Sequence, residues 1–300
     1  MSGIKCTVNL NNDGSGSFYT GNIVTGMVVL ELKRDKKIER IDFEVIGTCK
    51  AQWSRSKPTI PFIQIYSEKR RLLSEKIKDI FMDARKGNIM PAGVHRYPFH
   101  FVLPEDLPSS FESDIASIYY YIKIKSKPTF KINKVVPFHV LTSVNLNHSE
   151  EYLMPAQFDF EKEVSFKSGT IQATTRTYKA FAPKQNIPFE IVLNNEKQLK
   201  IKKIRITLVQ NLRYTVPSGY YEEDRDMCKV SYKKFSDTMA EIIHFDIDIP
   251  LIVPTSLNVN NPMVNVSYRF RMEVLFPCHI TLQEDLPVTV ASIPVVHYKF

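Results

Sequence analysis

Lysines recur through one short stretch of the chain, KIKSKPTFKINK, at residues 123–134. The cluster consists of Lys123, Lys125, Lys127, Lys131 and Lys134. Ammonium groups of this kind bind phosphates through charge-assisted hydrogen bonds, and they hold anionic membrane leaflets at roughly 1 kcal/mol per residue. The alternative interpretation is a solubilising face that also keeps an edge strand from pairing. The cluster is therefore a candidate phosphate-binding or acidic-lipid-binding site, and the solvated-face alternative stays open.

The charge of the whole chain has the same sign as the cluster. Lys and Arg number 40 against 32 Asp and Glu, which gives a formal net charge of +8. Two further basic runs are KRDKKIER at 33–40 and KQLKIKKIR at 197–205. This excess indicates an anionic partner or simply a soluble surface. No zinc finger, basic helix or aromatic RNA-binding signature accompanies it, so we expect no nucleic-acid partner.

Residue types that perform catalysis are present but form no motif. The sequence contains no G-x-S-x-G, P-loop or H-E-x-x-H pattern. Its cysteines form no C-x-x-C pair, and Cys278 and His279 would point to opposite faces of a strand. Cys228 fits either an exposed thiol or an inert one. We expect a non-enzymatic protein without cofactor or metal, with reduced thiols in the cytosol.

Apolar and polar residues alternate along most of the chain. In IIHFDIDIP, for example, Ile243, Phe245 and Ile247 alternate with His244 and Asp246. Such alternation is typical of antiparallel sheets with one face in a core and one in water, which places His244 in solvent. The segment SEKRRLLSEKIKDIFMD, at 67–83, fits either a short amphipathic helix or a charged edge strand.

Two histidines lie in MPAGVHRYPFHFVLPEDLPSSFE, at residues 90–112, where strand alternation meets several prolines. Proline is rare inside strands, so these prolines are expected to bracket one strand and to set the turn after it. His100 takes a polar, outward position. His95 is expected to pack or to form a hydrogen bond rather than to act in catalysis.

An internal repeat gives the domain organisation. The segment FHFVLPEDLPSSF, from Phe99, matches FDIDIPLIVPTSL, from Phe245, at a shift of 146 residues. Two further segments repeat in the same order at shifts of 148 and 163 residues. Repeats this long are duplicated domains rather than solenoid units. We predict domains at 1–148 and 164–300, joined by a hinge at 149–163, where the chain is polar and acidic.

Several segments together resemble the arrestin fold family, in particular its arrestin-domain-containing (α-arrestin) branch. FYTGNIVTGMVVLEL at 18–32 is similar to a motif of the first arrestin domain, with Thr20 in place of the usual proline. The stretch at 90–112 resembles a long run specific to the family. GTIQATTRTYKAFAPKQNIPFEIVLNN looks like the opening of the second domain, with Lys184 where glycine is common.

The resemblance implies an all-β protein of two tandem immunoglobulin-like antiparallel β-sandwich domains. It also implies a cytosolic adaptor that binds the cytoplasmic tails of membrane receptors or transporters for endocytosis and protein trafficking. The expected location is the cytoplasm, peripheral to the plasma membrane or endosomes, with acidic phospholipids as further partners.

Ligase recruitment and a second function remain open at this point. Many family members recruit HECT-type ubiquitin ligases through P-P-x-Y motifs. This sequence contains no P-P pair, so any such recruitment is expected to be indirect, through a partner. The alternative function is a structural scaffold subunit of an endosomal sorting or coat assembly.

Overall fold

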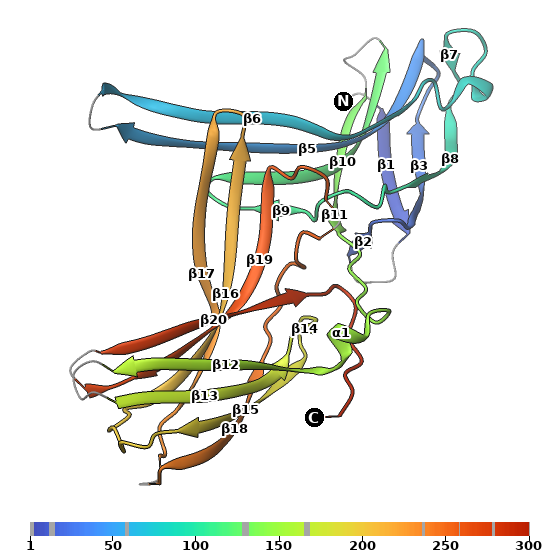
Figure 1. The fold of residues 1–300 in the computed structure, drawn as a ribbon. Coiled ribbons are helices and arrows are strands. Elements are labelled where there is room, and N and C mark those ends of the chain that lie inside the picture. The colour runs from blue at the N-terminus through green and yellow to red at the C-terminus, as the bar shows by residue number, and fades with distance from the viewer. Residues whose placement is uncertain are drawn as a thin grey trace. The chain divides into compact units, whose positions relative to one another are not determined.

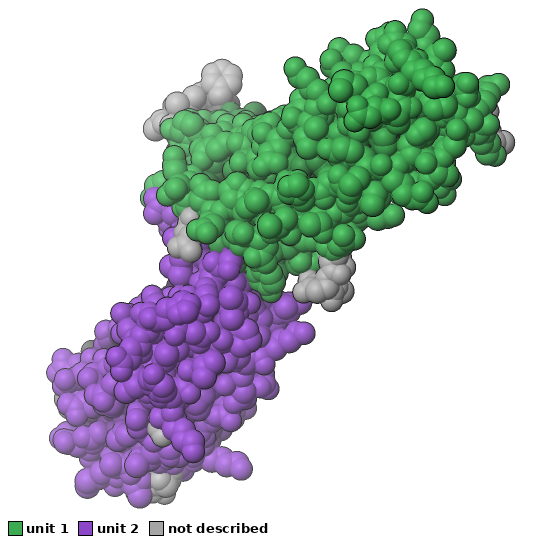
Figure 2. Space-filling model, turned by 90° about the vertical axis from the view of Figure 1, so that its right-hand side faces the viewer, with its two compact units in different colours: residues 1–142, 214–220, 258–263 green, residues 143–213, 221–257, 264–300 purple. Residues whose placement is uncertain are grey.

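The structure is a computed structural model. It describes residues 3–11, 16–57, 60–127, 132–164, 169–235, 238–257, 259–277 and 280–299, with the backbone alone at 57, 60–62, 164 and 169. Lys131, Cys278 and His279 lie outside these ranges. The chain divides into two compact units (Figure 2). Unit 1 contains residues 1–142, 214–220 and 258–263, and unit 2 contains residues 143–213, 221–257 and 264–300.

Unit 1 is a sandwich of two sheets (Figure 1). The smaller sheet has the order β1 (Ile4–Asn11), β3 (Ile23–Leu32), β8 (Gly93–Val102). The larger one has the order β2 (Ser17–Tyr19), β11 (Asn133–Leu141), β10 (Ala116–Lys127), β5 (Arg40–Lys57), β6 (Ile60–Ile77), and β9 (Phe111–Glu112) also pairs with β10. A two-stranded corner joins β4 (Lys36–Lys37) to β7 (Ile89–Met90), after the 3-10 helix η1 (Met82–Ala84).

Unit 2 repeats the two-sheet sandwich, with one additional strand in its smaller sheet. Its smaller sheet has the order β12 (Pro155–Val164), β13 (Gly169–Tyr178), β15 (Asn186–Asn194), β18 (Ala240–Asp248). Its larger sheet has the order β14 (Ala180–Phe181), β20 (Thr281–Val290), β19 (Val264–Leu275), β16 (Lys203–Val216), β17 (Gly219–Tyr232). In both larger sheets the first pair of strands is parallel, whereas β11–β10, β10–β5, β5–β6 and β20–β19 are antiparallel.

The register of the sheets confirms that the two units are copies of one fold. Gly26 on β3 pairs with Phe99 on β8, and Phe189 on β15 pairs with Phe245 on β18. These two pairs are related by the shifts of 163 and 146 residues seen in the sequence. The chain is thus an all-β protein of two immunoglobulin-like sandwiches, as predicted.

Hydrogen bonds outside the strands repeat as well. The Gly21 N–H donates to the carbonyl of Leu103 at 2.8 Å, and the Lys184 N–H donates to the carbonyl of Ile249 at 2.9 Å. Tyr120 and Tyr268 are buried, and each hydroxyl donates to a backbone carbonyl at 2.7 Å. Burial of a phenol requires such a partner, because an unsatisfied hydroxyl is costly.

Aromatic side chains fill both cores. In unit 1 the ring of Phe99 lies 4.8 Å from that of Phe43, measured between centroids. In unit 2 Phe189 contacts Phe270 edge-on at 4.9 Å. Pro91, Pro104 and Pro108 therefore flank the strand β8, whose aromatic face lies in the core, whereas Pro98 lies within the strand.

The structure assigns most of residues 67–83 to a strand, and residues 149–163 to a short helix and a strand. Residues 67–77 belong to β6, so the strand alternative is correct for most of 67–83, where pairing with β5 overrides the weak helical spacing. The span 149–163, predicted as a hinge, contains the short helix α1 (Glu150–Leu153) and most of β12. Its alternating residues pair with β13. Bending there stays a prediction.

The described residues contain no helix of the length and hydropathy that a membrane span needs.

Candidate functional site

The lysines of β10 lie on the outer face of the larger sheet of unit 1. Ile122 and Ile124 point inward and are fully buried, so Lys123 and Lys125 point outward, together with Tyr121. Lys127, at the end of β10, is exposed and pairs with Arg40 in register. The alternation of β10 thus brings together the first three lysines of the predicted cluster.

Carboxylates on the neighbouring strand β5 form ion pairs with lysines of this face. Glu44 lies opposite Lys123 in register, and its carboxylate is 3.6 Å from the Lys125 ammonium and 2.7 Å from that of Lys76. The hydrogen bond from Lys76 holds the pKa of Glu44 below its usual value. Burial, and then repulsion by Lys125, lowers the pKa of Lys123. Asp42 adds a second carboxylate next to Lys76, at 3.5 Å.

Lys134 does not face the same way. It pairs with Ile124, whose side chain is buried, so Lys134 lies on the inner side of the sheet at its border. Its charge acts on the Cys6 thiol of β1, where burial nevertheless raises the pKa to about 11. Lys131 lies outside the described residues. The five lysines are therefore not one face, and anion binding at them stays a prediction.

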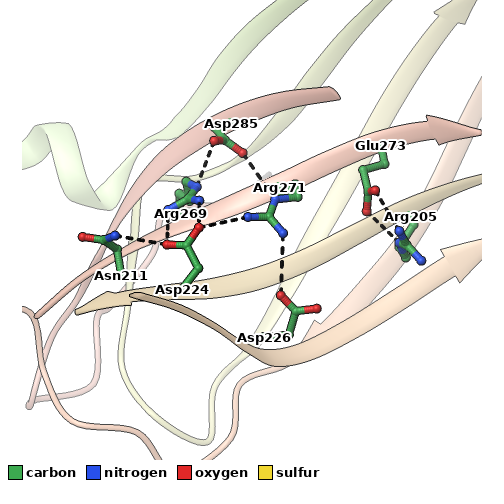
Figure 3. Close-up of polar contacts among 8 residues, drawn as sticks. All are labelled: Arg205, Asn211, Asp224, Asp226, Arg269, Arg271, Glu273 and Asp285. Atoms are coloured by element: carbon green, nitrogen blue, oxygen red, sulfur yellow. Dashed lines mark hydrogen bonds and ion pairs between the residues drawn. The ribbon is translucent and has the colours of Figure 1, made fainter. Parts of the chain in front are cut away.

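The corresponding face of unit 2 has its own charge network (Figure 3). Arg269 contacts Asp224 at 2.5 Å and Asp285 at 2.9 Å, and Arg271 also reaches Asp224, at 3.3 Å. Farther along the sheet, Arg205 forms two 2.7 Å hydrogen bonds with the carboxylate of Glu273. The guanidinium groups are matched by carboxylates, so this face offers little net charge to an external anion.

The free edge of the smaller sheet in unit 1 is the second candidate. Among the described residues β1 pairs only with β3. The registers relate β1 to β13, since Val8 pairs with Val28 as Thr175 pairs with Ile191. In unit 2 this position is covered, because β12 pairs with β13 along its whole length. In the part of the chain that the structure describes, the smaller sheet of unit 1 thus has three strands, where that of unit 2 has a fourth.

Residues on β13 are more deeply buried than residues on β1. Ile171 and Ala173 on β13 are 0% and 2% exposed, whereas Cys6 and Val8 on β1 are only half-buried. Phe160 on β12, which lies opposite Ala173, provides much of that cover. This edge was not predicted from the sequence. Its signal was the alternating segment PAQFDFEKEV, which precedes the strand of the second domain that corresponds to β1.

The histidines and cysteines occupy structural or solvated positions. The ring Nε2 of His95 lies 2.9 Å from the carbonyl oxygen of Pro91, which agrees with the hydrogen-bonding role predicted for it. His100 and His244 are exposed. Burial raises the pKa of Cys228 to about 11, so its thiol is protonated and weakly nucleophilic at neutral pH.

Two family models together match most of the chain. The family model described as "Arrestin (or S-antigen), N-terminal domain" matches residues 6–147, and "Arrestin (or S-antigen), C-terminal domain" matches residues 167–295. The chain belongs to the arrestin family.

Arrestin domain-containing proteins of other organisms are similar to most of this chain. Arrestin domain-containing protein 17 of Caenorhabditis elegans is 25% identical over 95% of this chain and 70% of its own length. Arrestin domain-containing protein 5 of Bos taurus is 24% identical over 93% of this chain and 88% of its own length. Proteins of this family are generally non-enzymatic adaptors, and membership supports an adaptor role in protein trafficking.

Proposed function

We propose that this chain is a trafficking adaptor whose unit 1 binds an extended segment of a membrane protein's cytoplasmic tail as a strand added to β1. The observation that carries the proposal is the open edge of β1, at the position where unit 2 has β12. Strand addition supplies affinity through backbone hydrogen bonds, and pockets for alternate side chains supply specificity.

The duplicated fold also specifies what the added strand looks like. On β13, Ala173 and Thr175 face Phe160 and Phe158 of β12. Their counterparts on β1 are Cys6 and Val8, because both pairs of strands keep the same register. The bound segment therefore runs antiparallel to β1 and places large apolar side chains opposite these two residues.

Charge near the edge selects the neighbouring residues of the tail. Lys134 on β11 lies near Cys6, and Lys5 lies on the outer face of β1. Acidic or phosphorylated residues next to the apolar positions would complement these ammonium groups. The proposal includes a location in the cytoplasm, peripheral to the plasma membrane or endosomes, a role in endocytosis, and indirect recruitment of a HECT-type ubiquitin ligase through a partner.

The function is tested by binding an array of tail peptides to the wild-type chain and to single-substitution variants of it. Val8→Asp places a carboxylate at the centre of the edge, so we expect tail peptides that bind the wild-type chain to lose most of their affinity. Asn9→Asp makes the same charge change on the opposite face of β1 and is the matched control. Hydrogen exchange on the wild-type complex should show new protection of the β1 amides.

Two outcomes would contradict the proposal. Equal binding by the Val8→Asp and Asn9→Asp variants would show that β1 is not the site, as would bound peptide without protection of β1. A stable stoichiometric complex on size-exclusion chromatography, independent of Val8, would instead support the scaffold alternative.

A further inference from the structure

A second surface of unit 1 is formed by its two-stranded corner. Here β4 and β7 pair, Lys36 with Met90 and Lys37 with Ile89. They enclose a shallow hollow of about 500 Å³. Its lining consists of Asp35, Lys36, Lys37, Lys86, Asn88 and Ile89. Figure 1 shows β7, and with it the corner, beside one end of β8.

The corner is held rigidly by its own hydrogen bonds. Lys86 and Ile89 exchange two backbone hydrogen bonds, at 3.0 and 3.1 Å, across a tight turn that contains Gly87 at φ +60°. The turn is joined to the neighbouring strand because the Ile38 N–H donates to the Asn88 carbonyl at 2.8 Å. Lys86 and Ile89 are therefore presented in fixed positions rather than on a loose loop.

The buried side chain of Arg85, just before the turn, ties this segment to residues 38–39. Arg85 donates to the carbonyls of Ile38 and Glu39 and pairs with Asp79. The Asp35 carboxylate, the acidic group in the hollow, accepts the Ala92 N–H at 2.8 Å. Lys37 and Lys86 are exposed, whereas Lys36 is half-buried, on the side of its register partner Met90, which is fully buried.

Further basic residues lie beside the hollow. Lys33 and Arg34 follow directly on β3 and are exposed, next to the lysines of the hollow. Among the described residues no carboxylate lies within salt-bridge distance of Lys36 or Lys86, whereas Lys125 shares Glu44. Beside these cations stands an exposed apolar side chain, Ile89, of which 50% is accessible to solvent.

We infer that this corner docks unit 1 on an anionic membrane surface. The lysines contact acidic headgroups, and Ile89 enters the boundary between headgroups and acyl chains. Basic residues combined with exposed apolar ones are the composition of interfacial membrane-binding surfaces. The docking surface is separate from the β1 edge, so it does not depend on strand addition.

Vesicle binding tests the inference with the full chain. Phosphatidylcholine vesicles with and without phosphatidylserine are sedimented with wild type and with a triple variant, Lys36→Gln, Lys37→Gln and Lys86→Gln. One lysine near an anionic surface is worth about fivefold in binding, so the triple variant should bind about a hundredfold more weakly at low salt. Ile89→Ser, at unchanged charge, should weaken binding about fivefold.

Matched variants decide between this surface and general charge. Lys123→Gln, Lys125→Gln and Lys127→Gln combined remove the same charge from β10, the alternative acidic-lipid site predicted from the sequence, and should leave vesicle binding within about twofold if the corner is the docking surface. An equal loss in both triple variants, or a loss only in the β10 variant, would overturn the inference, as would wild type that ignores phosphatidylserine. Val8→Asp should keep vesicle binding, which separates failure here from failure of the proposed function.

Discussion

Lys184 occupies a backbone conformation that lysine rarely adopts. Its φ is +68°, in the turn after β14, and the corresponding position of unit 1 is Gly21, at φ +81°. In this left-handed region the Cβ of an L-residue crowds the following carbonyl, at a cost of about 1–2 kcal/mol. Glycine there avoids the cost but loses about 0.5–1 kcal/mol through its greater freedom in the unfolded chain.

The difference predicts that Lys184→Gly stabilises unit 2. The net gain is about 0.5–1 kcal/mol, which corresponds to a rise in melting temperature of about 1–4 °C. The side chain of Lys184 is exposed, so little is lost by removing it. The hydrogen bond from its N–H to the Ile249 carbonyl is retained, because glycine keeps the donor.

Urea unfolding followed by two probes measures this change. The single tryptophan, Trp53, lies in unit 1, so its fluorescence reports that unit, whereas far-ultraviolet circular dichroism reports both. The Lys184→Ala variant is the control, because alanine removes the charged chain and keeps the Cβ. Stabilisation by glycine and not by alanine is the expected pattern; a Gly variant no more stable than the Ala variant would refute the strain argument.

Three further changes test the packing and the charge network. Gly47→Ala would place a Cβ 2.7 Å from the ring of Tyr120, so it should destabilise unit 1 by about 1–3 kcal/mol, measured by Trp53 fluorescence in urea. Tyr268→Phe leaves the half-buried Val253 carbonyl without its donor and the buried Gln210 amide without its acceptor, and should cost about 1–2 kcal/mol by circular dichroism in urea. Arg269 holds the pKa of Asp224 below its usual value; stability from this pair is present above the unfolded pKa and is lost as pH falls through the folded one. Asp224→Asn should therefore flatten the fall in stability below about pH 4, and an unchanged slope would contradict that assignment.

The fold was largely predictable because its repeat encodes register. The shifts of 146 and 163 residues seen in the sequence also relate two cross-strand pairs, Gly26–Phe99 in unit 1 and Phe189–Phe245 in unit 2. Alternation alone did not decide residues 67–83, where charged residues fit a helix and a strand equally. Long-range pairing with β5 settles that segment, and no local pattern contains this information.

The candidate site was predictable only in part. Alternation correctly places Lys123 and Lys125 together, but it does not show which carboxylates lie opposite them. Glu44 meets these lysines only because β5 and β10 are neighbours in one register. Likewise Lys134, counted in the same cluster, turns to the opposite side since it pairs with an inward-facing isoleucine.

An open β1 edge and a basic corner have complementary energetic roles. A short tail that adds to β1 buries few apolar groups, and the ordering of its backbone offsets much of the gain, so strand addition by itself is weak. Docking of the corner on the same membrane that holds the tail would convert the second contact into an intramolecular one at high effective concentration. Weak strand addition is then sufficient, and the adaptor would release its partner once either contact is lost. Variants of Val8 and of Lys36 should therefore each weaken binding to a membrane-anchored tail by about the factor by which they weaken the separate interaction, until the remaining contact alone sets the affinity.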